Sequence, residues 1–298
     1  MDYNTHRIPD PFTDDAMLLL DGHPQAVLSL AFSPDSTLLA SGAKDGGLRL
    51  WGVCGELVKE VTGSTKHERK ALAWHPAGTS FAVTHSLEFA VVSADGERVE
   101  PHALGPTRVT ALAYLAAELL VVGTSQALHL WDAAKTKPRP QKWLEREGIR
   151  AVAVHPPTKL VAWLSAGKLS LWDITKATPK AVPLSGMSGA VAVSPDGKLV
   201  AATTSWNVRV FETTRDAERE RLRGHKGQVT SLAFTPDGRT LLTGGWDETL
   251  RLWDVATGRE TACFELKIGK VNAVAVSPDG TRAAAGSLDG NLAVFDLM

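Results

Sequence analysis

The sequence predicts an all-β protein, a seven-bladed β-propeller built of four-stranded antiparallel blades. Three observations support this prediction. A pattern of short apolar runs recurs about every 41 residues over residues 22–298, and several of these runs end in a strong tight-turn signal. No segment longer than ten residues carries the 3.6-residue apolar stripe of a helix. Four short strands per repeat, repeated seven times, are typical of sheets arranged radially around an axis.

The repeat is visible in two independent alignment columns, in which successive positions lie 39–42 residues apart. One column holds the last large residue of the third predicted strand: Trp51, Val92, Trp131, Trp172, Phe211, Trp253 and Phe295. The other holds the first residue after the first strand: Ser33, His75, Leu115, His155, Ser194, Thr235 and Ser277. Because both columns give the same period, the repeat covers nearly the whole chain.

Each repeat is expected to contain four strands, and the sixth shows them best. Its first strand, 229–234, is apolar on both faces, which suits a sheet packed between two neighbouring sheets. The strand ends at Thr235-Pro236-Asp237-Gly238, where proline presets the turn and Asp-Gly tolerates positive φ. A second strand at 240–243 and a third at 250–253 follow, and a more polar fourth stretch leads into the next repeat.

The two ends of the sequence predict how the ring closes. Only three residues follow Phe295, which leaves no room for a fourth strand in the seventh repeat. Residues 17–20 precede Gly22-His23 as residues 219–222 precede Gly224-His225. We therefore expect this N-terminal strand to complete the last blade and to remove the free edge. Residues 1–16 are expected to form an acidic tail, and residues 17–298 the propeller.

Two repeats carry a motif that resembles a known family. Gly22-His23 followed by Trp51, and Gly224-His225 followed by Trp253-Asp254, are similar to the WD-repeat (Trp-Asp repeat) β-propeller family. The resemblance implies two hydrogen-bonded structural tetrads, namely His23, Ser41, Asp45 and Trp51, and His225, Thr243, Asp247 and Trp253. An imidazole can donate to the carboxylate and bond the hydroxyl, and the indole N–H completes the chain. Repeats two to five have Ser86, Ser125, Ala166 and Ser205 at the Asp position, so their blades should depend on packing.

The composition excludes several classes of protein. The chain has 298 residues, a net charge of −1, 44% hydrophobic and 22% charged residues, a balance that argues against whole-molecule attraction to nucleic acid or membrane. No apolar run approaches the about 18 residues of a membrane span, and residues 1–16 lack the pattern of a signal peptide. Cys54 and Cys263 fall in non-adjacent repeats, so no disulfide is expected. We expect a cytoplasmic protein that is a monomer on its own.

The candidate catalytic motifs do not favour an enzyme. His67-Glu68-Arg69-Lys70-Ala71 begins like a zinc-protease motif but has alanine where the second ligand belongs. Gly186-Met187-Ser188-Gly189-Ala190 lacks the last glycine and the helix of a hydrolase elbow. His23, Ser41 and Asp45 contain the residue types of a catalytic triad, but the same set recurs at the repeat spacing, as a structural network does. We therefore expect no catalytic residue, metal or cofactor; a propeller enzyme that uses the central channel is the weaker alternative.

Binding is then the predicted activity, and three alignment columns are expected on one rim of the ring. These are the residue before the tetrad Asp position and two positions at the start of each first strand. Five of the 21 positions are cationic and one, Glu68, is anionic. The candidate partner-binding residues are Lys44, Lys70, Arg108, Arg150, Trp246 and Lys270. We expect a protein partner whose segment is acidic or phosphorylated. Two alternatives stay open: the charges are merely solvated, or the chain is a nucleic-acid-associated adaptor, which would need a continuous basic face.

Overall fold

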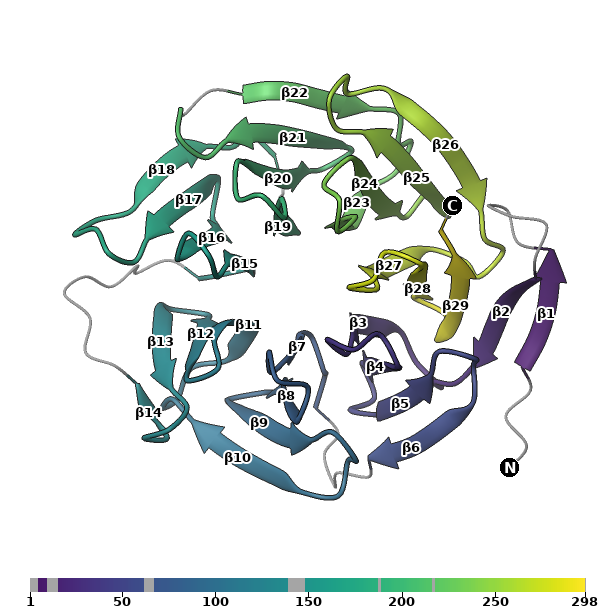
Figure 1. Ribbon diagram of the computed structural model, residues 1–298, viewed down its shortest axis with the longest axis horizontal. Helices are drawn as coiled ribbons and strands as arrows, with labels where there is room; N and C mark the ends of the chain where they lie inside the picture. The colour runs from purple at the N-terminus through teal and green to yellow at the C-terminus, as the bar shows by residue number, and fades with distance from the viewer. Residues whose placement is uncertain are drawn as a thin grey trace.

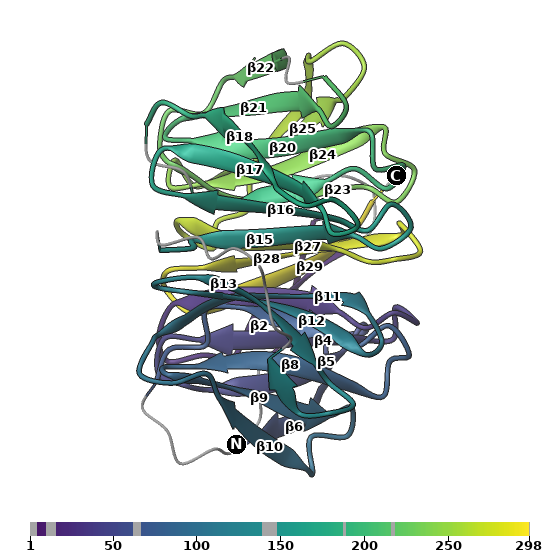
Figure 2. The same ribbon diagram turned by 90° about the vertical axis from the view of Figure 1, so that its left-hand side faces the viewer.

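The computed structural model describes residues 5–9, 16–61, 67–138, 148–186, 189–215 and 218–297. In these ranges the chain is all-β and folds into seven antiparallel sheets arranged around a central axis (Figure 1). The first strand of each sheet lies nearest the axis and the fourth lies at the periphery (Figure 1). Seen from the side, the strands run between the two faces of the ring (Figure 2). The predicted seven-bladed β-propeller is confirmed.

The first three blades follow the chain order from the axis outward. Blade 1 contains β3 (Val27–Phe32), β4 (Leu38–Ala43), β5 (Leu48–Gly52) and β6 (Leu57–Val61). Blade 2 contains β7 (Leu72–Trp74), β8 (Ser80–His85), β9 (Glu88–Ser93) and β10 (Val99–Ala103). Blade 3 contains β11 (Val109–Ala116), β12 (Leu119–Thr124), β13 (Leu128–Asp132) and β14 (Lys137–Pro138).

The next three blades repeat this order, and the last combines both ends of the chain. Blade 4 contains β15 (Ala151–His155), β16 (Leu160–Ser165), β17 (Lys168–Asp173) and β18 (Lys180–Pro183). Blade 5 contains β19 (Val191–Val193), β20 (Leu199–Thr204), β21 (Asn207–Glu212) and β22 (Glu218–Arg223). Blade 6 contains β23 (Val229–Phe234), β24 (Thr240–Gly245), β25 (Thr249–Asp254) and β26 (Glu260–Glu265). Blade 7 contains β27 (Val271–Val276), β28 (Arg282–Ser287), β29 (Asn291–Asp296), β2 (Ala16–Asp21) and β1 (Thr5–Pro9).

In blades 1, 5, 6 and 7 a short side-chain network holds the turn after the first strand, as the Ser/Thr-Pro-Asp pattern predicts. In blade 6 the Thr235 hydroxyl donates to Asp237 Oδ1 at 2.6 Å, and the Arg239 amide donates to the same oxygen at 3.0 Å. The Thr235 hydroxyl and the Arg239 amide lower the pKa of the Asp237 carboxyl. Gly238 has φ +70°, a conformation that L side chains rarely adopt. The turn therefore reverses the chain without an unpaired backbone donor.

The core consists of separate apolar clusters between neighbouring blades. Val27, Leu39 and Trp51 of blade 1 are almost completely buried against Leu292 and Leu20 of blade 7. Hydrogen bonds add to this packing at the innermost strands: the Thr230 hydroxyl of blade 6 donates to Val271 O of blade 7 at 2.8 Å. The Asn272 amide group of blade 7 donates in turn to Val27 O of blade 1 at 2.8 Å. The second strands β12, β16 and β20 are thus completely buried between neighbouring sheets, whereas the peripheral strands β10, β22 and β26 are mostly exposed.

The N-terminal strand closes the ring, as predicted. β2 pairs with β29 in antiparallel register, with Leu18 opposite Val294 and Leu20 opposite Leu292. Met17 and Leu20 are each 1% exposed, so β2 contributes to the core.

The structure adds a strand that the expected tail of residues 1–16 does not contain. β1 pairs with the outer edge of β2, with Arg7 opposite Leu18, and gives blade 7 a fifth strand (Figure 1). Residues 1–4 and 10–15 lie outside the described part of the chain. The physical reason for β1 is the unpaired backbone of the β2 edge, which a polar segment can satisfy through main-chain hydrogen bonds alone.

Candidate protein-interaction site

One face of the ring carries the turns between second and third strands together with the starts of the first strands, and we call this face the top rim. The backbone joins the predicted columns there. Lys44 N donates to Ala26 O, Trp246 N to Gln228 O, and Leu288 N to Lys270 O, each at 2.9 Å. Lys44, Arg108, Arg150 and Lys270 are exposed on this rim, as are Lys70 and Trp246. The structure therefore places all six candidate residues on one face.

The column two residues into each strand start surrounds the central channel. Its seven members, one from each blade, all line one cavity of about 260 Å³ on the axis: Leu28, Lys70, Thr110, Arg150, Gly189, Thr230 and Asn272. Two of them are the cations Lys70 and Arg150. Thr110, like Thr230 and Asn272, uses its side chain to join neighbouring blades, since its hydroxyl donates to Ile149 O at 2.6 Å. Lys70 and Arg150 are the charged members of this column.

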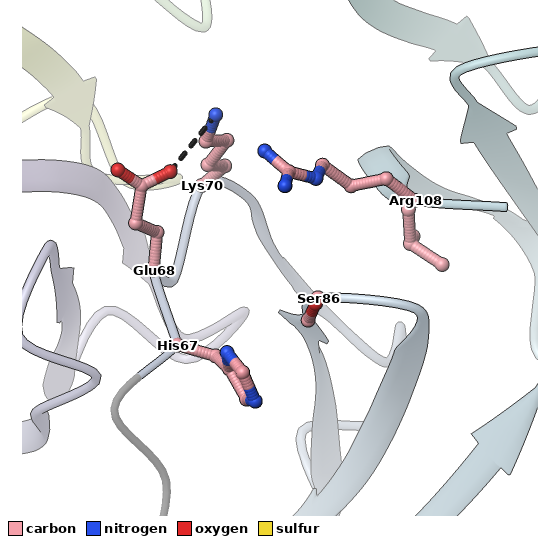
Figure 3. Close-up of a pocket in the computed structure, with 6 residues that line it drawn as sticks. His67, Glu68, Lys70, Ser86 and Arg108 are labelled. Carbon is pink, nitrogen blue, oxygen red and sulfur yellow. Dashed lines mark ion pairs between the residues drawn. The ribbon is translucent and has the colours of Figure 1, made fainter.

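Lys70 also lines a second cavity, of about 300 Å³, between blades 2 and 3. His67, Glu68, Ser86, Arg108 and Val109 complete its wall. Lys70 Nζ lies 2.9 Å from Glu68 Oε2, and the Arg108 side chain reaches toward Lys70 from the neighbouring blade (Figure 3). Lys44 and Lys270 are not among the residues that line either cavity. Lys70 thus shares one cavity with Arg108 and the axial cavity with Arg150.

A buried arginine behind this cavity was not anticipated. Arg69 is only 5% exposed, and its guanidinium donates to Gly46 O at 3.3 Å and Thr84 O at 3.2 Å. Burial lowers the pKa of Arg69. Burial and the charges of Arg69 and His67 likewise lower the pKa of His85, which stacks edge-on against His67 with ring centres 5.1 Å apart. The signal was present in the sequence, because Arg69 occupies a strand-start position that is valine or isoleucine in most repeats.

The top rim also carries three exposed apolar side chains in the turns between second and third strands. Trp246 is 40% exposed, Trp206 59% and Leu87 46%. Trp206 and Trp246 belong to the adjacent blades 5 and 6, and Leu87 to blade 2. The sequence interpretation missed Trp206 and Leu87 because both follow the tetrad Asp position, whereas the chosen column precedes it. The signal that would have found them is an aromatic or aliphatic residue at the tip of a polar turn.

The second of the two predicted tetrads is complete. His225 Nδ1 lies 3.0 Å from both oxygens of Asp247, and its Nε2 lies 2.8 Å from the Thr243 hydroxyl. The Trp253 indole donates to the same hydroxyl at 2.8 Å. Burial lowers the pKa of His225 against the opposing effect of Asp247, so the imidazole is neutral at pH 7 and Nδ1 donates to the carboxylate.

The first tetrad has only three of its four predicted members. His23 Nε2 lies 2.7 Å from the Ser41 hydroxyl, to which the Trp51 indole donates at 2.9 Å. Among the described residues His23 Nδ1 has no hydrogen-bond partner, and Asp45 instead accepts from the Gly47 amide at 2.9 Å. The prediction that Asp45 completes this tetrad is wrong.

The neighbours of the two aspartates give the physical reason. In blade 6, the Lys226 amide donates to Asp247 at 2.8 Å and the Thr249 hydroxyl at 2.9 Å, and together they hold the carboxylate against His225. The corresponding residues in blade 1 are Pro24, which has no N–H, and Gly47, which has no hydroxyl. Burial, with a smaller contribution from Arg49, lowers the pKa of the neutral His23 to about 4.

Other features bear on the alternatives that the sequence left open. Within the described ranges, no group of three or more His, Cys, Asp and Glu side chains is placed to hold a metal ion. No helix in the same ranges is long and apolar enough to cross a bilayer. Cys54 and Cys263 are both exposed and free, as expected. The hydrolase-like motif falls partly on residues 187–188, which lie outside the described residues.

Comparison with known proteins identifies the repeat. The family model described as WD domain, G-beta repeat, matches residues 16–52, 218–254 and 263–296. Each match runs from the fourth strand of one blade through the third strand of the next. The chain carries WD repeats in these three segments. The blades that match include the two with tetrads, whereas blades 2 to 5 contain the degenerate repeats.

Several relatives share this repeat. The chain is 31% identical over 149 residues to Protein groucho of Drosophila melanogaster, covering 46% of this chain and 20% of the relative. It is 26% identical over 271 residues to Ribosome biogenesis protein BOP1 of Mus musculus, covering 82% of this chain and 34% of the relative. It is 23% identical over 282 residues to DDB1- and CUL4-associated factor 13 of Xenopus laevis, covering 89% and 62%. This WD-repeat protein therefore spans less than two thirds of the length of each of these relatives.

Proposed function

We propose that this WD-repeat protein is a non-catalytic interaction scaffold or recognition subunit that binds a segment of a partner protein on its top rim. The observation that supports this proposal best is the grouping of Lys70, Arg108 and Arg150 around the channel mouth, on the same face as exposed Trp206 and Trp246. The names of relatives agree with it, since one is a factor associated with DDB1 and CUL4 and another acts in ribosome biogenesis.

The charges favour an acidic partner segment. Lys70 and Arg150 line the axial cavity, and Lys70 and Arg108 line the cavity beside it, against the single carboxylate of Glu68. A charge-assisted hydrogen bond contributes about 1.5–3 kcal/mol, more than a neutral one. Lys44 and Lys270 extend the positive charge around the rim and would mainly raise the rate of association.

The exposed tryptophans supply the apolar part of the surface. Tryptophan and arginine are the residue types that most often dominate the energy of a protein interface. Trp206 and Trp246 occupy the turns of adjacent blades, so a bound segment that crosses blades 5 and 6 can pack against exposed rings on both. The surface thus combines a cationic side at blades 2 to 4 with an aromatic side at blades 5 and 6.

A charge-reversal experiment tests the proposal. The double variant Arg108→Glu/Arg150→Glu is used as bait beside the wild type, and captured proteins are identified by mass spectrometry. The matched control is Arg239→Glu/Arg259→Glu, which reverses two exposed arginines in turns on the opposite rim. We expect the rim variant to lose a specific partner that wild type and control retain, with unchanged thermal unfolding. Retention of every partner by the rim variant would contradict the proposed site, and capture of RNA in place of protein would favour the adaptor alternative.

We also propose that the chain is a cytoplasmic protein and a monomer in the absence of a partner. Two free, exposed cysteines suit a reducing compartment, where thiols stay unpaired. Cell fractionation and sedimentation of the purified chain test these two statements directly.

A further inference from the structure

The cavity between blades 2 and 3 has hydrogen-bond donors that the protein itself leaves unused. Within the described ranges, the Arg108 guanidinium makes no hydrogen bond or ion pair, and the Ser86 hydroxyl makes no hydrogen bond, although both line this cavity. The third donor, Lys70 Nζ, lies 2.9 Å from Glu68 Oε2. Figure 3 shows the Lys70 and Arg108 side chains extending from opposite sides of the cavity, with Ser86 below them. The cavity is thus lined by three donor-bearing side chains from two blades.

The surroundings of the cavity are electropositive. Arg69 lies buried next to Lys70 in the chain, and among its contacts its guanidinium donates to the carbonyl oxygens of Gly46 and Thr84. The charges of Arg69 and His67 act on the His85 imidazole, where they add to burial in lowering its pKa. Glu68 is the only carboxylate among the lining residues. Two cations, Lys70 and Arg108, therefore line the cavity with one carboxylate, that of Glu68.

The arrangement favours a phosphate group over a carboxylate. Glu68 already gives Lys70 a carboxylate partner, so a carboxylate ligand would replace one such ion pair by another. A phosphorylated side chain carries about −1.5 to −2 charges at pH 7 and three acceptor oxygens, enough to accept from Lys70, Arg108 and Ser86 together. The cavity volume of about 300 Å³ is at the lower end for small-ligand sites, which suits one phosphorylated residue.

We propose that this cavity is a binding site for the phosphate of a phosphoserine or phosphothreonine in the partner segment, and that Glu68 weakens binding by competing for Lys70. The inference rests on the proposed function, because it assigns the site to a segment bound on the top rim. Because Glu68 must be displaced from Lys70, an unphosphorylated acidic side chain gains little binding free energy at this site, whereas a phosphate dianion gains more.

The test titrates the full chain with three probes: capped phosphoserine, capped glutamate and inorganic phosphate, each followed by calorimetry or by NMR shifts of the chain. We expect capped phosphoserine to bind at least about tenfold more tightly than capped glutamate. Arg108→Ala should weaken phosphoserine binding about tenfold or more, as the loss of one charge-assisted hydrogen bond does. Glu68→Gln should strengthen it severalfold. The matched control Arg239→Ala removes an exposed arginine in a turn on the opposite rim and should change the affinity less than twofold.

Three results would overturn the inference. These are equal affinity for phosphoserine and glutamate, phosphoserine binding that Arg108→Ala leaves intact, and inorganic phosphate bound more tightly than the capped residue, which would indicate a site for a free anion. The two proposals can fail separately. If the Arg108→Glu/Arg150→Glu variant loses its partner but the wild type does not bind capped phosphoserine, the phosphate site is refuted and the docking face is not. If the wild type binds capped phosphoserine but the Arg108→Glu/Arg150→Glu variant still captures every partner, the docking face is refuted and the phosphate site is not.

Discussion

The difference between the two tetrads predicts that equivalent aspartates have unequal effects on stability. The perturbation is Asp247→Ala in blade 6, with Asp45→Ala in blade 1 as the matched control. Asp247 accepts hydrogen bonds from His225 Nδ1 at 3.0 Å, the Lys226 amide at 2.8 Å and the Thr249 hydroxyl at 2.9 Å. Asp45 accepts one, from the Gly47 amide at 2.9 Å.

The expected magnitudes follow from burial. The His225 side chain is only 1% exposed, so Asp247→Ala leaves its ring nitrogen without a partner away from water. Leaving one buried donor unpaired costs about 1–3 kcal/mol, and the loss of the bonds from the buried Thr249 hydroxyl and the exposed Lys226 amide brings the total to about 2–4 kcal/mol. The single bond of Asp45 lies in a turn open to water, so its loss should cost about 0.5–1 kcal/mol.

The assay is urea unfolding at pH 7.5, in which both variants are compared with wild type at constant m value. Asp247→Ala should lower the midpoint clearly and Asp45→Ala only slightly. Equal losses in the two variants would refute the reasoning, because they would mean that the carboxylate acts through the turn and not through the histidine.

Three further predictions concern pH, ring closure and the rim. Burial lowers the pKa of His23 to about 4, below its ordinary value of about 6.5, so the free energy of unfolding should be highest above pH 6.5 and should fall by up to about 3 kcal/mol as the pH drops toward 4. His23→Asn should flatten this part of the stability profile, and a profile unchanged by the substitution would exclude His23 as the cause. Deletion of residues 1–21 removes β1 and β2, including the buried Met17 and Leu20, and should abolish cooperative thermal unfolding; a melting curve like that of the full chain would disprove closure by β2. Trp206→Ala and Trp246→Ala should each weaken binding of a captured partner about tenfold or more and leave thermal stability unchanged, whereas Val58→Ala on the outer strand β6 should have no effect. If the tryptophan variants and the wild type bind the partner with equal affinity in a titration, the two tryptophans are not part of the site.

The features that were predictable from sequence are those that the repeat encodes several times. Seven blades, their turns and the pairing of β2 with β29 follow from patterns that recur about every 41 residues, so an error in one repeat is corrected by the others. The column around the channel was predictable for the same reason, because Lys70 and Arg150 occupy equivalent positions in repeats two and four. Periodicity thus fixes where a residue lies.

Periodicity does not fix what a residue contacts, and the missed features are of this kind. Asp45 has the right spacing for a tetrad, but Pro24 and Gly47 remove the two donors that hold Asp247 in place. β1 has no apolar alternation, because it pairs with β2 through its backbone. Trp206 was missed for another reason, because it follows the tetrad Asp position and the chosen column precedes that position.

The pairing of β2 with β29 orders events during synthesis. Leu20 leaves the ribosome about 270 residues before Leu292, its partner, which at typical elongation rates is a delay on the order of tens of seconds. During that time β2 is an apolar strand without its eventual neighbour, the kind of segment on which nascent chains aggregate. β1 is near in sequence and pairs with the other edge of β2, so a local hairpin can form within microseconds. The fifth strand, β1, can thus pair with one edge of β2 before β29 is synthesised.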